Sequence, residues 1–232
     1  MSRRESGSGV VPARASLAIR TVSLFGLPIS TLDTAATVAV LVRAARDELA
    51  PGGAGGRRAP FLATYANPHT INQLRDERGF LDELRRFHLV YPDGVGLVWA
   101  SRALRAALPE RVTASDFLPG FCREAAAHRL ALFFVGGEPG VAEEAALRLA
   151  TVAPGLVVAG THPGFFASDE AEGALVERIR ALAVDAVLVG MGSPRQERWI
   201  LRHGERLGAP LVGGWAGCST STRDATRARR AG

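Results

Sequence analysis

Short apolar runs alternate with longer amphipathic segments along most of the chain. In the second half the apolar runs are residues 131–135, 156–159, 186–189 and 210–212, and a stretch with helical periodicity separates each run from the next. Buried parallel strands are typically short β-branched runs, and the helices that connect them cover both faces of the sheet. The pattern predicts the α/β class: a single Rossmann-like domain with a mainly parallel sheet and helices on both faces.

The expected elements divide the chain into three parts. The first half adds strands at 17–24, 61–65 and 89–91, and helices at 34–49, at 68–87 with a break near Gly79, and at 95–108; the second-half helices fall at 115–128, 141–152, 170–182 and 194–207. Pro28 indicates a turn, Asp33 a helix start, and residues 51–60 a loop. We expect a flexible leader at 1–15, one domain at 16–214, and an irregular basic tail at 215–232.

The tail breaks the pattern. From Trp215 onward the sequence WAGCSTSTRDATRARRAG has no apolar period. Read one nucleotide earlier, its codons permit Val-Gly-Gly-Leu-Phe-Asp-Phe-Tyr-Ser-Gly-Arg, followed by an Arg-Ala-Pro. All 28 Lys+Arg residues are Arg, as expected from a GC-rich gene. Such a gene favours G and C at the third codon positions, and the shifted reading needs those bases. The tail is therefore interpreted as a frameshift product, and an ordinary disordered basic tail is the alternative.

Composition excludes several classes of protein. The formal charge is +5, but much of the excess lies at the two ends and in the loop at 51–60, and aromatic residues make up only 6% without alternating with arginines. A positive charge could indicate nucleic acid, but it fits an anionic small substrate or a lipid surface equally well. Because the aromatic residues that stack on bases are not interleaved with arginines, we expect no nucleic-acid partner. Cys122 and Cys218 lack metal-ligand spacing, no signal peptide is evident, and no run approaches the roughly 20 apolar residues that span a bilayer. The expected location is the cytoplasm, with any membrane contact peripheral.

Four turns that follow predicted strands could carry chemistry. They lie at residues 65–68, 91–96, 135–140 and 190–197. In the last, Gly190 and Gly192 allow close backbone approach, Ser193 is a natural N-cap, and Pro194 suits the first helical position, so free N–H groups there could hold a diphosphate. A capped turn with no ligand explains the same residues.

Asp93 is the acidic residue most suited to a general base, because turn residues flank it at the end of a predicted strand. An Asp that only stabilises its own turn is the alternative. Asn67 before Pro68 suits a helix cap, and Arg111 alone suits a solvated surface position. No Asp-x-Asp pair is present to hold a nucleotide-bound cation, and the histidines are too scattered to indicate a metal.

Taken together, these turns resemble the WecG/TagA/CpsF glycosyltransferase family, known as family 26. The motifs run in order from about Val22 to Gly214. They are Phe25-Gly26-Leu27-Pro28-Ile29, Asn67-Pro68-His69, Tyr91-Pro92-Asp93-Gly94-Val95-Gly96, Arg111-Val112-Thr113-Ala114-Ser115-Asp116, Phe134-Val135-Gly136-Gly137, Gly160-Thr161-His162-Pro163-Gly164-Phe165-Phe166 and Gly190-Met191-Gly192-Ser193-Pro194-Arg195-Gln196-Glu197. Seven motifs in order are far more specific than any one of them.

The resemblance implies an inverting transferase that needs no metal or other cofactor. It would move an N-acetylmannosamine-type sugar from a UDP donor to the GlcNAc of an undecaprenyl-diphosphate-linked acceptor, for a cell-surface polysaccharide or teichoic acid. It also implies peripheral contact with the inner face of the plasma membrane. The oligomeric state stays open, a homo-oligomer included.

The resemblance also implies roles for individual residues. Asp93 corresponds to the family's proposed base. The positions associated with substrate are Thr64, Tyr65, Asn67, Arg111, Gly136, Gly137, Gly190, Gly192, Ser193 and Gln196. Where the family commonly has Thr two residues before the Asn, this chain has Tyr65, with Thr64 beside it. The resemblance implies that family members continue beyond the Gly-Gly strand into a Phe-Asp-Phe segment, an Arg-Ala-Pro segment and an arginine-bearing appendage. Only the shifted frame encodes the Phe-Asp-Phe and Arg-Ala-Pro segments. The activity of the printed form is therefore expected to be impaired.

Two other functions remain open. A Rossmann-type oxidoreductase is suggested by the turn at 135–140, although residues 136–140 are not a G-x-G-x-x-G and no acidic residue ends the next strand. A non-catalytic remnant that binds a UDP-sugar is the other.

Overall fold

The computed structural model describes residues 19–49, 59–106 and 108–216. The leader expected at 1–15, most of the loop expected at 51–60 and the tail from residue 217 lie outside the described residues. The elements, in chain order, are β1 (Thr21–Leu24), β2 (Leu27–Ser30), α1 (Thr34–Ala45), β3 (Phe61–Ala66), α2 (Pro68–Asp76), α3 (Phe80–Leu84), β4 (Leu89–Pro92), α4 (Val95–Ala103), α5 (Ala114–Ala127), β5 (Ala131–Gly136), α6 (Val141–Val152), β6 (Val157–His162), α7 (Asp169–Leu182), β7 (Ala186–Gly190), α8 (Arg195–Leu207) and β8 (Leu211–Gly214).

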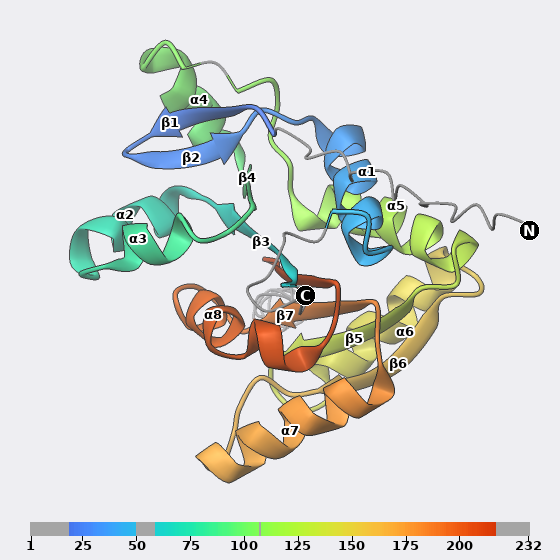
Figure 1. The fold of residues 1–232 in the computed structure, drawn as a ribbon. Coiled ribbons are helices and arrows are strands. Elements are labelled where there is room, and N and C mark those ends of the chain that lie inside the picture. Colours follow the sequence, from blue (N-terminus) through green and yellow to red (C-terminus); the bar gives the residue numbers. More distant parts are fainter. Residues whose placement is uncertain (1–18, 50–58, 107, 217–232) are drawn as a thin grey trace, which may run out of the picture.

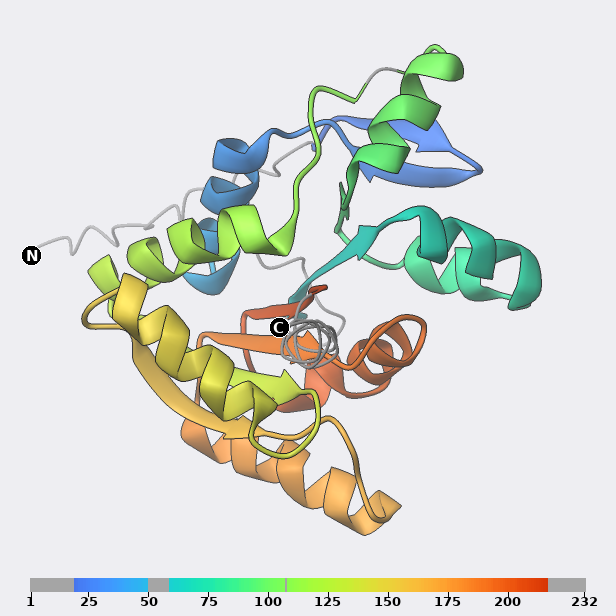
Figure 2. The same cartoon turned by 180° about the vertical axis from the view of Figure 1, so that it is seen from behind.

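Six of the strands form one sheet in the order β4-β3-β8-β7-β5-β6, and every neighbouring pair is parallel. Successive residues of a strand point to opposite faces. In β5, Leu132 and Phe134 therefore join a core with α1, α5 and α6, whereas Phe133 and Val135 join a second core with α3, α4, α7 and α8. Figures 1 and 2 show these helices on the two sides of the sheet. The predicted α/β class is confirmed.

The N-terminal strand differs from the prediction. Instead of one strand at 17–24, β1 and β2 form a separate antiparallel hairpin, closed by a two-residue turn at Phe25 and Gly26. Both turn residues have positive φ, 54° and 80°, as this tight hairpin turn requires. Pro28, expected in a turn, lies within β2, where a two-stranded ribbon tolerates it. The pattern missed the hairpin because a bulky Phe rarely adopts positive φ.

Helix starts follow the predicted chemistry at two places and depart from it at a third. Asp33 caps α1, its Oδ1 accepting from the N–H of Ala36 at 2.7 Å, and Asn67 caps α2, its Oδ1 accepting from the N–H of Thr70 at 2.9 Å. The prediction that Ser193 caps α8 is wrong: the N-cap is Pro194, and Ser193 lies one residue before it. The first turn of α8 is instead stabilised by a backbone hydrogen bond, in which the N–H of Gln196 donates to the carbonyl of Gly192 at 2.9 Å.

Candidate active site

Asp93 lies just beyond the carboxyl end of β4. Its backbone N–H donates to the carbonyl of Ala66, the last residue of the neighbouring strand β3, at 2.7 Å. Gly94, with φ of 95°, then turns the chain into α4. Because parallel strands end at the same edge of the sheet, this turn brings Asp93 next to Asn67, whose Nδ2 donates to Asp93 Oδ2 at 3.4 Å. Asn67 is thus both the cap of α2 and a contact of the candidate base.

The charges around Asp93 act in opposite directions. Partial burial raises the pKa of Asp93 above its ordinary value, the hydrogen bond from Asn67 and the charge of Arg111 lower it, and the charge of Asp116 raises it. Arg111 is held near the end of β4 because the N–H of Val112 donates to the carbonyl of Pro92 at 2.7 Å. Its guanidinium also forms an ion pair with Asp116, at 3.3 Å. Arg111, although half-exposed, therefore belongs to the electrostatic surroundings of Asp93.

Thr64 and Gln196 lie below this surface, inside the protein. Both are fully buried, and both donate to the same oxygen of Glu197, from Thr64 Oγ1 at 2.8 Å and from Gln196 Nε2 at 2.8 Å. Gly214 at the end of β8 leaves the space that they occupy, since a Cβ there would lie 2.8 Å from Gln196 Nε2. In this structure the two side chains form an internal network that joins β3, β8 and α8.

Tyr65, the neighbour of Thr64 in β3, lies within the electrostatic influence of both Glu197 and Asp93. Its ring is buried, and its pKa is raised by burial first and then by the charges of Glu197 and Asp93, while the Gln196 side chain lowers it. The structure therefore brings Asp93, Asn67, Tyr65, Thr64 and Gln196 together at the carboxyl ends of β3 and β4 and the start of α8.

Glu197 is the residue of this cluster that the sequence analysis passed over. It is fully buried, forms no ion pair with any described residue, and burial raises its pKa. The helical period gives a signal that could have found it: Glu197 shares the buried face of α8 with Ile200 and Gly204, where a carboxylate is not expected. Such a group is costly to ionise, so its protonation should be linked to folding.

We expect Glu197→Gln to change how stability depends on pH. The pKa of Glu197 is higher in the folded than in the unfolded chain, so its contribution to stability is fully present below the ordinary pKa of 4.5 and is lost as the pH rises through the raised value. The glutamine of the variant cannot ionise, so the variant should become more stable relative to the wild type as the pH rises over that range. Urea denaturation at a series of pH values measures the difference, and a difference that does not change with pH contradicts it. Glu205→Gln, exposed on the same helix, is the matched control.

The predicted glycines bring three segments into close contact. The N–H of Gly137 donates to the carbonyl of Gly190 at 3.1 Å, and the N–H of Gly164, in the β6–α7 loop, donates to the carbonyl of Gly137 at 2.8 Å. A Cβ on Gly136 would lie 2.3 Å from the carbonyl oxygen of Gly190. Gly136, Gly137 and Gly190 therefore join the ends of β5 and β7, and the N–H of Gly137 is already used within the protein.

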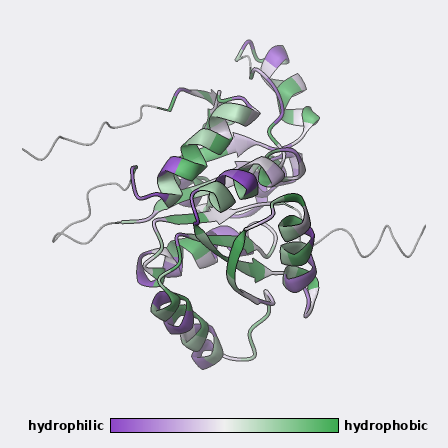
Figure 3. Ribbon diagram, turned by 90° about the vertical axis from the view of Figure 1, so that its right-hand side faces the viewer, coloured by the Kyte–Doolittle hydropathy of each residue, from purple (hydrophilic) through white to green (hydrophobic). Residues whose placement is uncertain are grey.

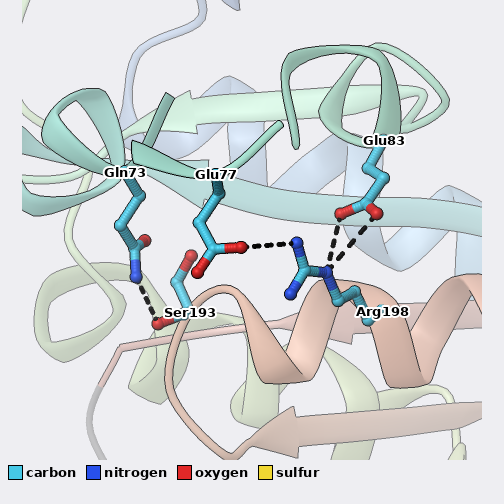
Figure 4. Close-up of polar contacts among 5 residues, drawn as sticks. All are labelled: Gln73, Glu77, Glu83, Ser193 and Arg198. Atoms are coloured by element: carbon cyan, nitrogen blue, oxygen red, sulfur yellow. Dashed lines mark hydrogen bonds and ion pairs between the residues drawn. The ribbon is translucent and has the colours of Figure 1, made fainter. Parts of the chain in front are cut away.

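The turn between β7 and α8 has a different character. Among the described residues, no hydrogen-bond acceptor is found for the N–H groups of Gly192 and Ser193. The carbonyl of Ser193 accepts from Gln73 Nε2 of α2 at 2.8 Å (Figure 4). The turn is thus fixed from the α2 side while it keeps two unused donors beside the start of a helix.

Arg198 fastens α8 to the α2–α3 segment on the same side. Its Nη2 lies 3.0 Å from Glu77 Oε2 and its Nε 3.0 Å from Glu83 Oε2, as Figure 4 shows. Together with the contact between Gln73 and Ser193, this pairing fixes α2, and with it Asn67, relative to α8. Two helices that follow different strands thereby keep one arrangement around the candidate site.

Comparison with known proteins identifies the family of the chain. The model of the glycosyl transferase WecG/TagA/CpsF family matches residues 22–221. The chain belongs to the WecG/TagA/CpsF family. The match extends past Gly214, where the sequence analysis placed the end of the resemblance, and Trp215 packs in the core, its ring 5.9 Å from that of Phe134.

Curated relatives of this chain include proteins of three Staphylococcus aureus strains, NCTC 8325, COL and MRSA252. Each is named N-acetylglucosaminyldiphosphoundecaprenol N-acetyl-beta-D-mannosaminyltransferase and is 28% identical to this chain over 157 residues. The aligned part covers 68% of this chain and 60% of each relative. The chain thus spans about 60% of the length of the curated relatives that it matches.

Within residues 19–49, 59–106 and 108–216, His, Cys, Asp and Glu side chains form no group of three or more that could hold a metal ion. Over the same residues, each helix is too short or too polar to cross a bilayer.

Proposed function

We propose that this member of the WecG/TagA/CpsF family is an inverting glycosyltransferase. It would move an N-acetylmannosamine-type sugar from a UDP donor to the GlcNAc of an undecaprenyl-diphosphate-linked acceptor, at the cytoplasmic face of the membrane. The observation that carries the proposal is the position of Asp93. Its carboxylate lies at the rim of the sheet, contacts Asn67, is influenced by Arg111, and has a raised pKa. The names of the staphylococcal relatives supply the class of donor sugar and of acceptor.

The reaction is a single displacement. Asp93 accepts the proton of the acceptor hydroxyl while that oxygen forms a bond to the anomeric carbon of the donor sugar. The bond from that carbon to the UDP oxygen breaks, and the electron pair leaves with UDP. Attack from the face opposite the leaving group inverts the anomeric configuration. A raised pKa suits a general base, because it increases the affinity of the carboxylate for the proton that it takes from the acceptor hydroxyl.

We propose that the leaving diphosphate binds at the turn between β7 and α8. The unused N–H groups of Gly192 and Ser193 lie beside the start of α8, where the helix dipole also favours negative charge. The proposal assigns the stabilisation of this charge to N–H donors and arginines instead of a metal or other cofactor. Absence of an Asp-x-Asp pair from the sequence supports that assignment.

We also propose that the frame after Gly214 is shifted, and that the shifted frame encodes the Phe-Asp-Phe and Arg-Ala-Pro segments that the resemblance implies after the Gly-Gly strand. Arginines that stabilise a leaving group in a preorganised site are worth several kcal/mol of transition-state stabilisation, so replacing an arginine-bearing segment with the residues of the printed frame would slow the transfer. Resequencing the gene around the Gly214 codon tests this directly. A gene that encodes the printed tail contradicts it.

Two measurements test the function as a whole. UDP-GlcNAc or UDP-ManNAc should protect the chain against heat, and NAD should not, because a ligand that binds only the folded state raises its stability. Protection by NAD alone would instead indicate an oxidoreductase. Transfer of sugar to lipid-diphosphate GlcNAc by the frame-restored chain then separates an enzyme from a UDP-sugar-binding remnant.

The rate should depend on pH through Asp93. Because the pKa of Asp93 is raised above 3.8, kcat/KM should rise with pH through an acidic limb whose midpoint lies above that value. Asp116→Asn should move the limb to lower pH, since the charge of Asp116 raises this pKa, and Asn67→Ala should move it to higher pH. The profile of kcat/KM against pH is the measurement. A limb that stays in place in Asp116→Asn contradicts the assignment.

A further inference from the structure

Helix α4 presents one apolar face to solvent. Val95 and Trp99 lie four residues apart on that face and are 46% and 64% exposed, and Leu104, which follows the helix, is 55% exposed. On the opposite face Leu97 and Val98 are buried in the core. Figures 1 and 2 show α4 reaching outward from the sheet, and in Figure 3 the helix at the top of the molecule has green and pale turns and a purple outer end.

Trp99 stands out among the tryptophans. The chain has three, and the other two, Trp199 and Trp215, are only 5% and 6% exposed. A large aromatic side chain that projects into water beside other exposed apolar groups is typical of a surface that another phase or molecule covers. Tryptophan is also the residue that membrane interfaces favour, because its ring is apolar and its N–H is polar.

The charges beside this face favour an anionic partner. Arg102 and Arg105 are exposed, and neither forms an ion pair with any described residue. From Gly94 to Pro109 the sequence contains no Asp or Glu. Many other arginines, such as Arg85 and Arg148, have a carboxylate close by. We define the α4 surface as Val95, Trp99, Arg102, Leu104 and Arg105.

The α4 surface adjoins the candidate base. Val95 comes two residues after Asp93, and Gly96 packs so closely on Pro68 that a Cβ at Gly96 would lie 2.8 Å from Pro68 Cγ. Pro68 in turn follows Asn67, the contact of Asp93. A lipid-linked acceptor that approaches along α4 would therefore carry its sugar toward Asp93.

We propose that the α4 surface docks this chain on an anionic lipid bilayer. Trp99, Val95 and Leu104 enter the interface between headgroups and acyl chains, and Arg102 and Arg105 contact lipid phosphates. This inference rests on the proposed function, because a lipid-linked acceptor would give the chain a reason to bind a membrane. It assigns a membrane contact within residues 95–105, separate from any segment after Gly214.

Vesicle binding tests the surface without any donor sugar. The 232-residue chain is mixed with phosphatidylcholine vesicles with and without phosphatidylglycerol, and tryptophan emission and sedimentation are measured. Because Trp199 and Trp215 are buried, a blue shift and quenching by brominated lipid report mainly on Trp99. We expect both signals with anionic vesicles, and weaker binding at high salt because the phosphate contacts are screened.

Matched variants identify the residues responsible. Trp99→Ser should weaken partition into anionic vesicles by about tenfold, and Arg102→Gln with Arg105→Gln by a similar factor. Leu147→Ser, which removes a 71% exposed leucine from α6, is the control and should bind as the wild type does. Partition of Trp99→Ser equal to that of Leu147→Ser overturns the proposal. A blue shift that depends on protein concentration without vesicles also overturns it, in favour of self-association.

The outcome separates this inference from the proposed function. Vesicle binding that depends on Trp99, combined with no transfer to lipid-diphosphate GlcNAc by the frame-restored chain, supports the surface and contradicts the transferase. Sugar transfer combined with vesicle binding that does not depend on Trp99 contradicts the proposed α4 surface and supports the proposed transferase function.

Discussion

Replacing Asp93 with alanine should reduce sugar transfer by the frame-restored chain by about 10²- to 10⁴-fold, because the acceptor hydroxyl then has no positioned base. The fold should persist. The only hydrogen bond to the carboxylate from a described side chain is the long one from Asn67 at 3.4 Å, and burial already disfavours its ionised form, as the raised pKa indicates. Initial rates with UDP-ManNAc and lipid-diphosphate GlcNAc measure the loss, and urea denaturation measures the stability.

Two controls separate loss of the base from loss of charge or fold. Asp76→Asn removes an exposed carboxylate at the end of α2 and should leave the rate unchanged. Asp93→Asn keeps the size and much of the hydrogen bonding of the side chain but cannot accept the proton. Its transfer rate should therefore be as low as that of Asp93→Ala. Normal turnover by either Asp93 variant contradicts the assignment of Asp93 as the base.

The architecture could be predicted where periodicity alone decides it. Short β-branched runs such as residues 186–189 became central strands, because a strand buried on both faces needs apolar residues at every position. The hairpin could not be predicted in this way. Its turn depends on positive φ at Phe25, which the rest of the fold enforces against the preference of the residue itself.

The candidate site was partly predictable for a topological reason. Asp93 and Asn67 follow different strands, and parallel strands of one sheet bring such positions to the same edge. The sequence could not tell which side chains face outward at that edge. Thr64 and Gln196 turn inward to Glu197, and the N–H of Gly137 bonds to Gly190, because these contacts depend on how α8 and β5 pack. Ser193 failed as a cap for the same reason: α8 starts with a backbone contact to Gly192.

Gly136→Ala should destabilise the fold by roughly 3–5 kcal/mol, the second large effect that the structure implies. Two costs add at this position. Gly136 has φ of 153°, which L-residues rarely adopt, and the new Cβ would lie 2.3 Å from the carbonyl oxygen of Gly190. Backbone atoms of a central strand cannot yield as the end of a flexible side chain can, so β5 and β7 would have to separate at the edge where the site is built.

Gly155→Ala is the control that separates these two costs. Gly155 also has positive φ, 88°, but a Cβ there would meet no atom within 4 Å, so its variant bears only the backbone strain of about 1–2 kcal/mol. Urea denaturation of both variants gives the two free energies of unfolding, and their difference measures the close approach of β5 to β7. If Gly136→Ala costs no more than Gly155→Ala, the strand ends have room to move apart. The glycines at 136 and 190 would then serve a ligand instead of the packing of the sheet.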